Sequence, residues 1–185
     1  METATAILVN RHRLTETSLI VHWCSADLGL FKTVAKGALR PKSAFAGRLD
    51  LFATSEVAFT RAKVSDLHTL KEVQIQEPRR KLRDSYARVL AATYFCKLVE
   101  MVAERETPLG SLHALLTLSL DYLDSHDPGS VLVQRYENKM CADLGLGTPE
   151  RGGAILLQDV FHHPLPAQRE LLLQEIRRLE AKDRD

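Results

Sequence analysis

The chain has 185 residues, of which 45% are hydrophobic and 26% charged, the balance of a soluble globular protein rather than a disordered one. Its three cysteines (Cys24, Cys96 and Cys141) are far apart and odd in number, which excludes a disulfide framework and a zinc site of closely paired cysteines. No apolar run approaches the roughly 20 residues that cross a bilayer, and the N-terminus lacks the order of a secretory signal, so we expect a soluble, cytoplasmic protein.

The net charge of +1 conceals an uneven distribution. Residues 1–83 hold 14 Lys and Arg against 8 Asp and Glu, whereas residues 84–185 hold 11 against 16. The stretch 31–48 contains no acid and five cations: Lys32, Lys36, Arg40, Lys42 and Arg48. This division favours contact between the first half and a polyanion, and a chance division remains the alternative.

The residues before Pro78 predict five short strands. Short apolar or alternating runs occupy residues 4–9, 17–23, 30–35, 51–59 and the region of 73–75, and the polar residues 10–13 are expected to end the first. Trp23 and Phe31 lie in such runs, where core packing is favoured over stacking on a nucleobase. Five short strands within residues 1–77 predict a small closed or nearly closed barrel.

After Pro78 the apolar period becomes helical, and residues 78–185 predict an all-α domain. One long helix is expected over 82–105, a second from Thr107-Pro108 to 123, and a third from Asp127-Pro128 until Gly145 and Gly147 end it. A short helix over 155–161 and a last one from Pro166 to about 179 complete a helical bundle. The predicted fold class is therefore α+β, a barrel followed by a bundle.

Catalytic motifs are absent: there is no glycine-rich phosphate loop, no GxSxG and no HExxH. His162 and His163 are adjacent, and neighbours on a helix cannot both face one metal, so a solvated or C-capping role is expected. Cys141 lies on the apolar stripe of the third helix and is expected to be a buried structural thiol. Asp121 and Asp124 share a helix face and are expected to be surface charges. We expect neither an enzyme nor a cofactor.

The cations of the first half are the best candidates for a binding site. Lys32 and Lys36 share a strand face, and Gly37 then turns the chain into a loop that carries Arg40 and Lys42. With Arg11 and Arg48 in support, these groups could follow a phosphodiester backbone, although a merely solvated loop is an equal alternative on charge alone. A second cluster is formed by Arg79, Arg80, Lys81 and Arg83, where a solvated helix start is the commoner explanation.

Several segments resemble the bacterial recombination mediator family RecO. The resemblance lies in Leu-Thr-Glu-Thr-Ser-Leu-Ile-Val at 14–21, Val-Ala-Lys-Gly at 34–37, Lys42-Ser43 and Gly-Arg-Leu-Asp-Leu-Phe at 47–52. It continues more weakly through Arg-Tyr-Glu at 135–137 and Leu-Gly-Leu at 144–146, and covers most of residues 1–147. The proline that the family has in the last barrel motif is replaced by Leu51.

The resemblance implies an oligonucleotide-binding (OB) barrel followed by a helical domain. It also implies binding and annealing of single- and double-stranded DNA, loading of RecA with RecR, contact with the C-terminal tail of single-strand binding protein, and association with the nucleoid. The family position of that tail corresponds to Arg135, with Lys139 one turn away. Because Tyr136 is expected to point into the bundle, Arg135 should border the apolar face, and an ordinary ion pair is the alternative for it.

Two functions therefore remain open. The first is a DNA-binding recombination mediator, and the second is an adaptor that binds the tail of single-strand binding protein without appreciable DNA affinity. Many family members carry a four-cysteine zinc module after the third helix, but no cysteine follows Cys141 here. We therefore expect no bound metal, and partner contacts of that module are not carried over.

Overall fold

The computed structural model describes residues 1–147 and 149–182. The chain divides into two compact units: residues 1–79 with 103–113, and residues 80–102 with the chain from 114 onward. All named strands lie in the first unit and nearly all helical residues in the second, which confirms the α+β class. The last three positions of the expected helical domain, 183–185, lie outside the described residues.

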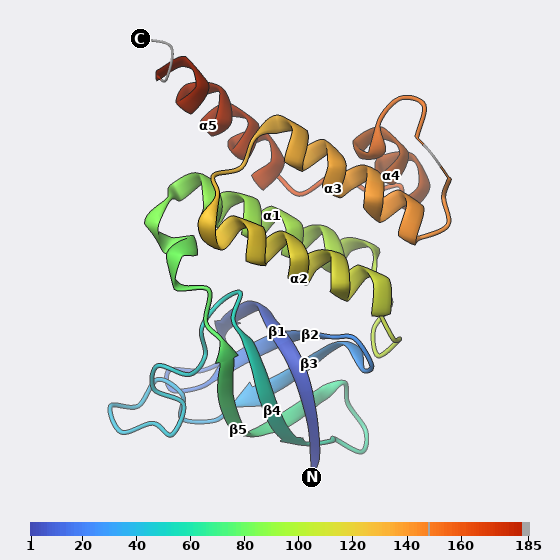
Figure 1. Cartoon of the computed structure of the whole chain (residues 1–185). Coiled ribbons are helices and arrows are strands. Elements are labelled where there is room, and N and C mark those ends of the chain that lie inside the picture. The colour runs from blue at the N-terminus through green and yellow to red at the C-terminus, as the bar shows by residue number, and fades with distance from the viewer. Residues whose placement is uncertain (148, 183–185) are drawn as a thin grey trace. The chain divides into compact units, whose positions relative to one another are not determined.

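The first unit is built on a closed five-stranded barrel (Figure 1). Its strands are β1 (Glu2–Arg13), β2 (Leu19–Ser25), β3 (Gly29–Ala35), β4 (Thr54–Thr60) and β5 (Leu67–Glu77). They close in the order β1-β2-β3-β5-β4, with β3 and β5 parallel and every other neighbouring pair antiparallel. A five-stranded barrel of this kind is the OB-fold that the sequence predicted.

The inward-facing residues of the strands form the barrel core, because successive side chains of a strand point to opposite faces. Trp23 and Phe31 are both buried there, which confirms core packing. The indole Nε1 of Trp23 donates a hydrogen bond of 2.8 Å to Thr33 Oγ1, so the polar end of this ring is also satisfied inside the barrel. The Phe31 and Phe59 rings stack with their centroids 5.0 Å apart.

Two strand boundaries differ from those expected. β1 does not end at residue 9 but continues to Arg13, because the register shifts between Leu8 and Asn10 and the polar residues then pair with β2. β4 begins at Thr54 rather than at residue 51, because Phe52 has a positive φ of 70° that no strand accommodates.

The segment 103–109 returns to the first unit and runs along the β2–β3 turn. The Glu106 N–H donates to Leu30 O at 3.0 Å, and the Leu109 N–H donates to Ala26 O at 2.9 Å. Gly29, with φ 71°, has no Cβ, and an added one would lie 2.1 Å from Thr107 O. Only glycine therefore permits this close approach.

The second unit consists of helices. Their bounds are η1 (Arg80–Asp84, a 3₁₀ helix), α1 (Tyr86–Val102), α2 (Gly110–Ser125), α3 (Ser130–Asp143), α4 (Gly153–Phe161) and α5 (Gln168–Lys182). Within this unit α1 packs against α5, and α3 packs against α4. Tyr136 points into the bundle as expected, where its ring stacks on Phe95 at 3.9 Å between centroids.

The helix boundaries show where local sequence signals are overridden. The long helix expected over 82–105 is instead η1 followed by α1, and α1 ends at Val102. α2 begins at Gly110 rather than at Pro108, because the Leu109 N–H is already bonded to the barrel. α3 is capped by Gly129 and not by Asp127, and it ends before Gly145, whose φ is 72°. Asp124 accepts a hydrogen bond from the Leu82 N–H at 3.2 Å, so it is not a plain surface charge.

No helix among the described residues is long and apolar enough to cross a membrane.

Candidate nucleic-acid interface

The loop 36–53 joins β3 to β4 and carries most of the predicted DNA-contacting cations (Figure 1). It is a chain of tight turns: the Arg40 N–H donates to Gly37 O at 3.1 Å, Ser43 N–H to Arg40 O at 3.1 Å, and Arg48 N–H to Phe45 O at 3.0 Å. Gly37, with φ 68°, starts this series as expected. The loop therefore has a defined conformation, although it contains neither helix nor strand.

Two apolar side chains of the loop fill part of the barrel core. Phe45 and Leu49 are 9% and 5% exposed, and both belong to the cluster that contains Trp23 and Phe31. The guanidinium of Arg11, on β1, donates through Nη1 to the carbonyl oxygen of Leu49. Arg11 thus lies beside the loop, and its contact within the protein is with the loop backbone.

The predicted cations lie on the outside of this structure. Lys32 is half-buried on β3, where His22 of β2 is its register partner. Lys36 does not share a strand face with it as expected, because β3 ends at Ala35. The loop cations are exposed: Lys36, Arg40, Lys42 and Arg48. Among the described residues none of these five groups makes an ion pair. Their positive charge is therefore not neutralised by a partner in the chain.

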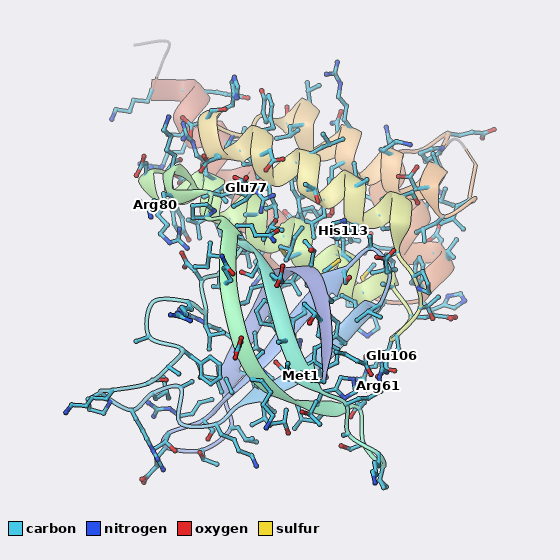
Figure 2. The ribbon with its side chains drawn as sticks, turned by 60° about the horizontal axis from the view of Figure 1, so that its bottom comes forward. Met1, Arg61, Glu77, Arg80, Glu106 and His113 are labelled. Atoms are coloured by element: carbon cyan, nitrogen blue, oxygen red, sulfur yellow. The ribbon has the colours of Figure 1, made fainter. Side chains whose placement is uncertain are left out.

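Several other cations of the chain do have acidic partners. Arg61 pairs with Glu2 at 2.9 Å and with Glu106 at 2.8 Å, and Figure 2 shows Arg61 and Glu106 side by side. Further ion pairs are Arg105–Asp66, Arg88–Asp127, Lys139–Asp143, Arg169–Glu137 and Arg178–Glu175. The cations of the 36–48 stretch therefore differ from these, whose charges are neutralised by acidic partners within the fold.

One side of the barrel is acidic. A groove of about 470 Å³ lies between Arg48 and the strands β4 and β5, and its lining includes Glu56 and Glu72. Both carboxylates are exposed. Arg48 therefore lines a groove that also presents two carboxylates.

The second basic cluster, at 79–83, is less accessible than its sequence suggests. Arg79 is buried, and its guanidinium Nη1 donates to Phe52 O at 2.7 Å and to Thr54 Oγ1 at 2.9 Å. Arg79 therefore stabilises the start of β4. Its charge is not on the surface of the basic cluster.

A separate apolar groove lies between α2 and α3. Its volume is about 380 Å³, and the residues lining it are Leu118, Ser119, Tyr122, Gly129, Val131, Leu132 and Arg135. Leu118, Tyr122 and Val131 are 69%, 44% and 55% exposed, which is unusual for such large apolar groups on one surface. Arg135 makes no ion pair among the described residues, whereas Lys139 pairs with Asp143 and is not among the lining residues.

The described residues contain no group of three or more His, Cys, Asp or Glu side chains placed to hold a metal ion. All three cysteines are buried, and burial followed by the charge of Glu137 raises the pKa of the Cys141 thiol, as expected for a structural thiol. His162 adopts the left-handed conformation at the C-terminus of α4, which confirms its capping role. The absence of bound zinc stays a prediction, which elemental analysis of protein purified without a metal-affinity tag can check.

Two functional features were missed by sequence reasoning. The burial of Phe45 and Leu49 had no periodic signal, because both lie in an irregular loop. An apolar surface beside Arg135 was expected, but its α2 side was missed despite a detectable signal. Leu118 and Tyr122 are four residues apart on α2, on a different face from the core stripe of Leu112, Leu116 and Leu120.

Comparison with known families gives two adjacent matches. The model described as "Recombination protein O N terminal" matches residues 1–79, and "Recombination protein O C terminal" matches residues 83–151. The chain belongs to the RecO family. The two matches lie on the barrel and on the helices that follow it, so the family assignment agrees with the fold.

Relatives of this RecO chain are described as "DNA repair protein RecO". The protein of Symbiobacterium thermophilum is 33% identical over 141 residues, 75% of this chain and 54% of the relative. Those of Dehalococcoides mccartyi and Listeria monocytogenes are each 28% identical, over 76% and 79% of this chain and 54% and 56% of the relatives. The chain spans about half the length of the curated relatives that it matches.

Proposed function

We propose that this chain is a DNA-binding recombination mediator in DNA repair, acting without enzymatic turnover. Membership of the RecO family supports this role. The observation that carries it is the set of exposed loop cations without ion pairs, held on the OB-fold barrel. Under the same proposal the chain anneals complementary strands and acts with RecR to load RecA.

In this proposal Lys36, Arg40 and Lys42 contact phosphates, and Lys32 and Arg48 extend the path at its two ends. Ammonium and guanidinium groups bind phosphate by charge and hydrogen bonding, which does not depend on base sequence. All five aromatic residues of the barrel (Trp23, Phe31, Phe45, Phe52 and Phe59) are buried. The contacts are therefore expected to be made mainly with the backbone.

The test is fluorescence anisotropy with a single-stranded oligonucleotide at several salt concentrations. Each neutralised phosphate adds about 0.7 to the slope of log K against log salt, so replacing Lys36, Arg40 and Lys42 by Ala should flatten the slope by roughly two. Lys63→Ala with Lys71→Ala removes two exposed charges from the same unit and should leave the slope unchanged. Equal slopes for the triple variant and the parent would place the DNA site elsewhere.

We propose as a second activity that the α2–α3 groove binds the C-terminal tail of single-strand binding protein. An acidic peptide with a terminal carboxylate suits a groove that combines exposed apolar side chains with an arginine lacking an ion pair. The guanidinium of Arg135 can hold a carboxylate bidentately while Leu118 and Tyr122 contact an apolar side chain of the tail. If DNA binding is absent, this groove supports the alternative function of an adaptor.

Calorimetry with the tail peptide of the cognate single-strand binding protein tests the groove. Arg135→Ala and Tyr122→Ala should each weaken binding about tenfold or more, since a buried charge-assisted hydrogen bond or a packed ring contributes more than 1 kcal/mol. Arg177→Ala removes an exposed arginine from α5 and is the matched control. Binding by Arg135→Ala as tight as that of the parent rejects the assignment.

A further inference from the structure

The basic loop is held to the barrel at both of its ends. At the first end the Leu39 N–H donates to Thr17 O at 3.0 Å. At the second end the Phe52 N–H donates to Leu8 O at 2.8 Å, and the Leu8 N–H donates to Ala53 O at 3.0 Å. These bonds continue the β1–β4 side of the barrel beyond the Ile7–Thr54 pair, while Leu8 is also the register partner of Trp23 on β2.

Between these ends the loop is held by Phe45, Leu49 and Arg11. The side chains of Phe45 and Leu49 are buried in the barrel core. Arg11 adds the contact from its guanidinium to the Leu49 carbonyl oxygen, at a point 38 residues away in the chain. Leu49 is therefore fixed twice, by burial of its side chain and by the hydrogen bond to its backbone.

This contact changes the role that charge alone assigns to Arg11. The Arg11 Nη1–H that donates to the Leu49 carbonyl oxygen is engaged within the protein, so this donor is not available to a phosphate. The residue that it holds is next to Arg48 and seven residues after Lys42. Restraining the loop before DNA arrives reduces the conformational entropy that binding would otherwise cost.

We propose that Arg11 is a positioning residue for DNA binding: it holds the phosphate-contacting loop in place through Leu49 and does not itself contact phosphate. This inference rests on the proposed DNA-binding function. It predicts that loss of Arg11 weakens binding without changing the number of neutralised phosphates.

The test combines DNA binding with tryptic cleavage of the loop in DNA-free protein. Arg11→Met should weaken binding about three- to tenfold, as expected for loss of one charge-assisted hydrogen bond, and leave the salt slope unchanged. Mass spectrometry should show faster cleavage after Lys36, Lys42 and Arg48. Arg13→Met is the matched control, because it removes a neighbouring exposed arginine from β1 whose side chain makes no hydrogen bond or ion pair among the described residues. It should leave loop cleavage unchanged.

Leu49→Ala tests the same link from the other side while retaining every charge. It should also speed loop cleavage and weaken DNA binding at an unchanged salt slope. Because the buried side chain and the backbone hydrogen bond restrain Leu49 separately, the double variant should bind more weakly than either single variant. Urea unfolding of each variant identifies any loss of the whole fold.

A salt slope that falls by about 0.7 in Arg11→Met overturns the inference, whatever happens to loop cleavage. So does an unchanged rate of loop cleavage. If the parent protein does not bind DNA at all, the proposed function fails and the inference fails with it, whereas the cleavage result still shows whether Arg11 restrains the loop.

Discussion

Glu137 is a carboxylate with almost no access to solvent, and its partners come from two other helices. It accepts hydrogen bonds from Tyr94 Oη at 2.7 Å and from Arg169 Nε at 2.7 Å. Burial, followed by the charge of Glu137, raises the pKa of the Tyr94 hydroxyl well above its usual value, so Tyr94 remains a hydrogen-bond donor at physiological pH. The network joins α1, α3 and α5 through one buried charge.

Arg169→Ala should therefore lower the free energy of unfolding by about 3 kcal/mol or more, because it leaves a buried carboxylate without its cation. Arg178→Ala removes an exposed arginine that pairs with Glu175 on the same helix, and it should change stability far less. Urea unfolding compares the two. Equal effects would show that the Glu137 network contributes no more than a surface pair.

His113 provides a pH-dependent contribution to stability. Burial and then the charge of Arg79 lower the pKa of its imidazole, and Asp27 acts in the opposite direction. Because the unfolded chain binds this proton more readily than the folded protein, stability is retained above the ordinary histidine pKa of about 6.5 and falls as the pH drops below it. His113→Gln should reduce the loss of stability between pH 7.5 and 5.5.

The matched control for this prediction is His163→Gln, since His163 is exposed after α4. His163→Gln should lose as much stability between pH 7.5 and 5.5 as the parent protein does. Urea unfolding at both pH values measures each difference. If the stability of His113→Gln depends on pH as strongly as that of the parent, other groups cause the pH dependence.

At the scale of elements, the contact between Gly29 and the segment 103–109 depends on the absence of one methyl group. Gly29→Ala places a Cβ on a residue with positive φ, which costs about 1–2 kcal/mol. The new Cβ would also collide with Thr107 O. Gly47→Ala adds the same backbone penalty, since φ is 70°, but meets no atom within 4 Å. Only Gly29→Ala should abolish the hydrogen-exchange protection of the Glu106 and Leu109 amides. Loss of protection in both variants would indicate general destabilisation.

The sequence predicted elements better than their ends. Alternation and helical period identified the five strands and the main helices, since burial of one face leaves a regular pattern. The ends depend on partners distant in the chain: residues 10–13 form a strand because β2 pairs with them, and α2 starts late because Leu109 bonds to Ala26. Local propensity contains no information about such partners.

The same reasoning explains what was predicted of the site. The density of cations in 31–48 is visible in the sequence, but their lack of ion pairs is not, because ion-pair partners such as Glu2 and Arg61 are 59 residues apart. The loop contact of Arg11 was likewise invisible, and the sequence therefore grouped it with the phosphate-contacting residues.

At the scale of the whole molecule, the buried cysteines report on the two units separately. Cys24 lies in the first unit, whereas Cys96 and Cys141 lie in the second. In native protein all three should react slowly with a thiol reagent, because the thiolate is not exposed. At intermediate urea concentrations Cys96 and Cys141 should become reactive together. Mass spectrometry after pulsed labelling measures each, and labelling of Cys96 with Cys24 but not with Cys141 would contradict the division.

The first unit is made of two separate stretches of chain, and this has a consequence during protein synthesis. Residues 1–79 emerge from the ribosome first. The stretch 103–113, which makes backbone hydrogen bonds to the β2–β3 turn, follows 24 to 34 residues later. At a translation rate of about 5–20 residues per second, the nascent barrel waits for roughly one to seven seconds before its last backbone partners emerge. During that interval the carbonyl oxygens of Ala26 and Leu30 are open to chaperones, solvent or another nascent chain.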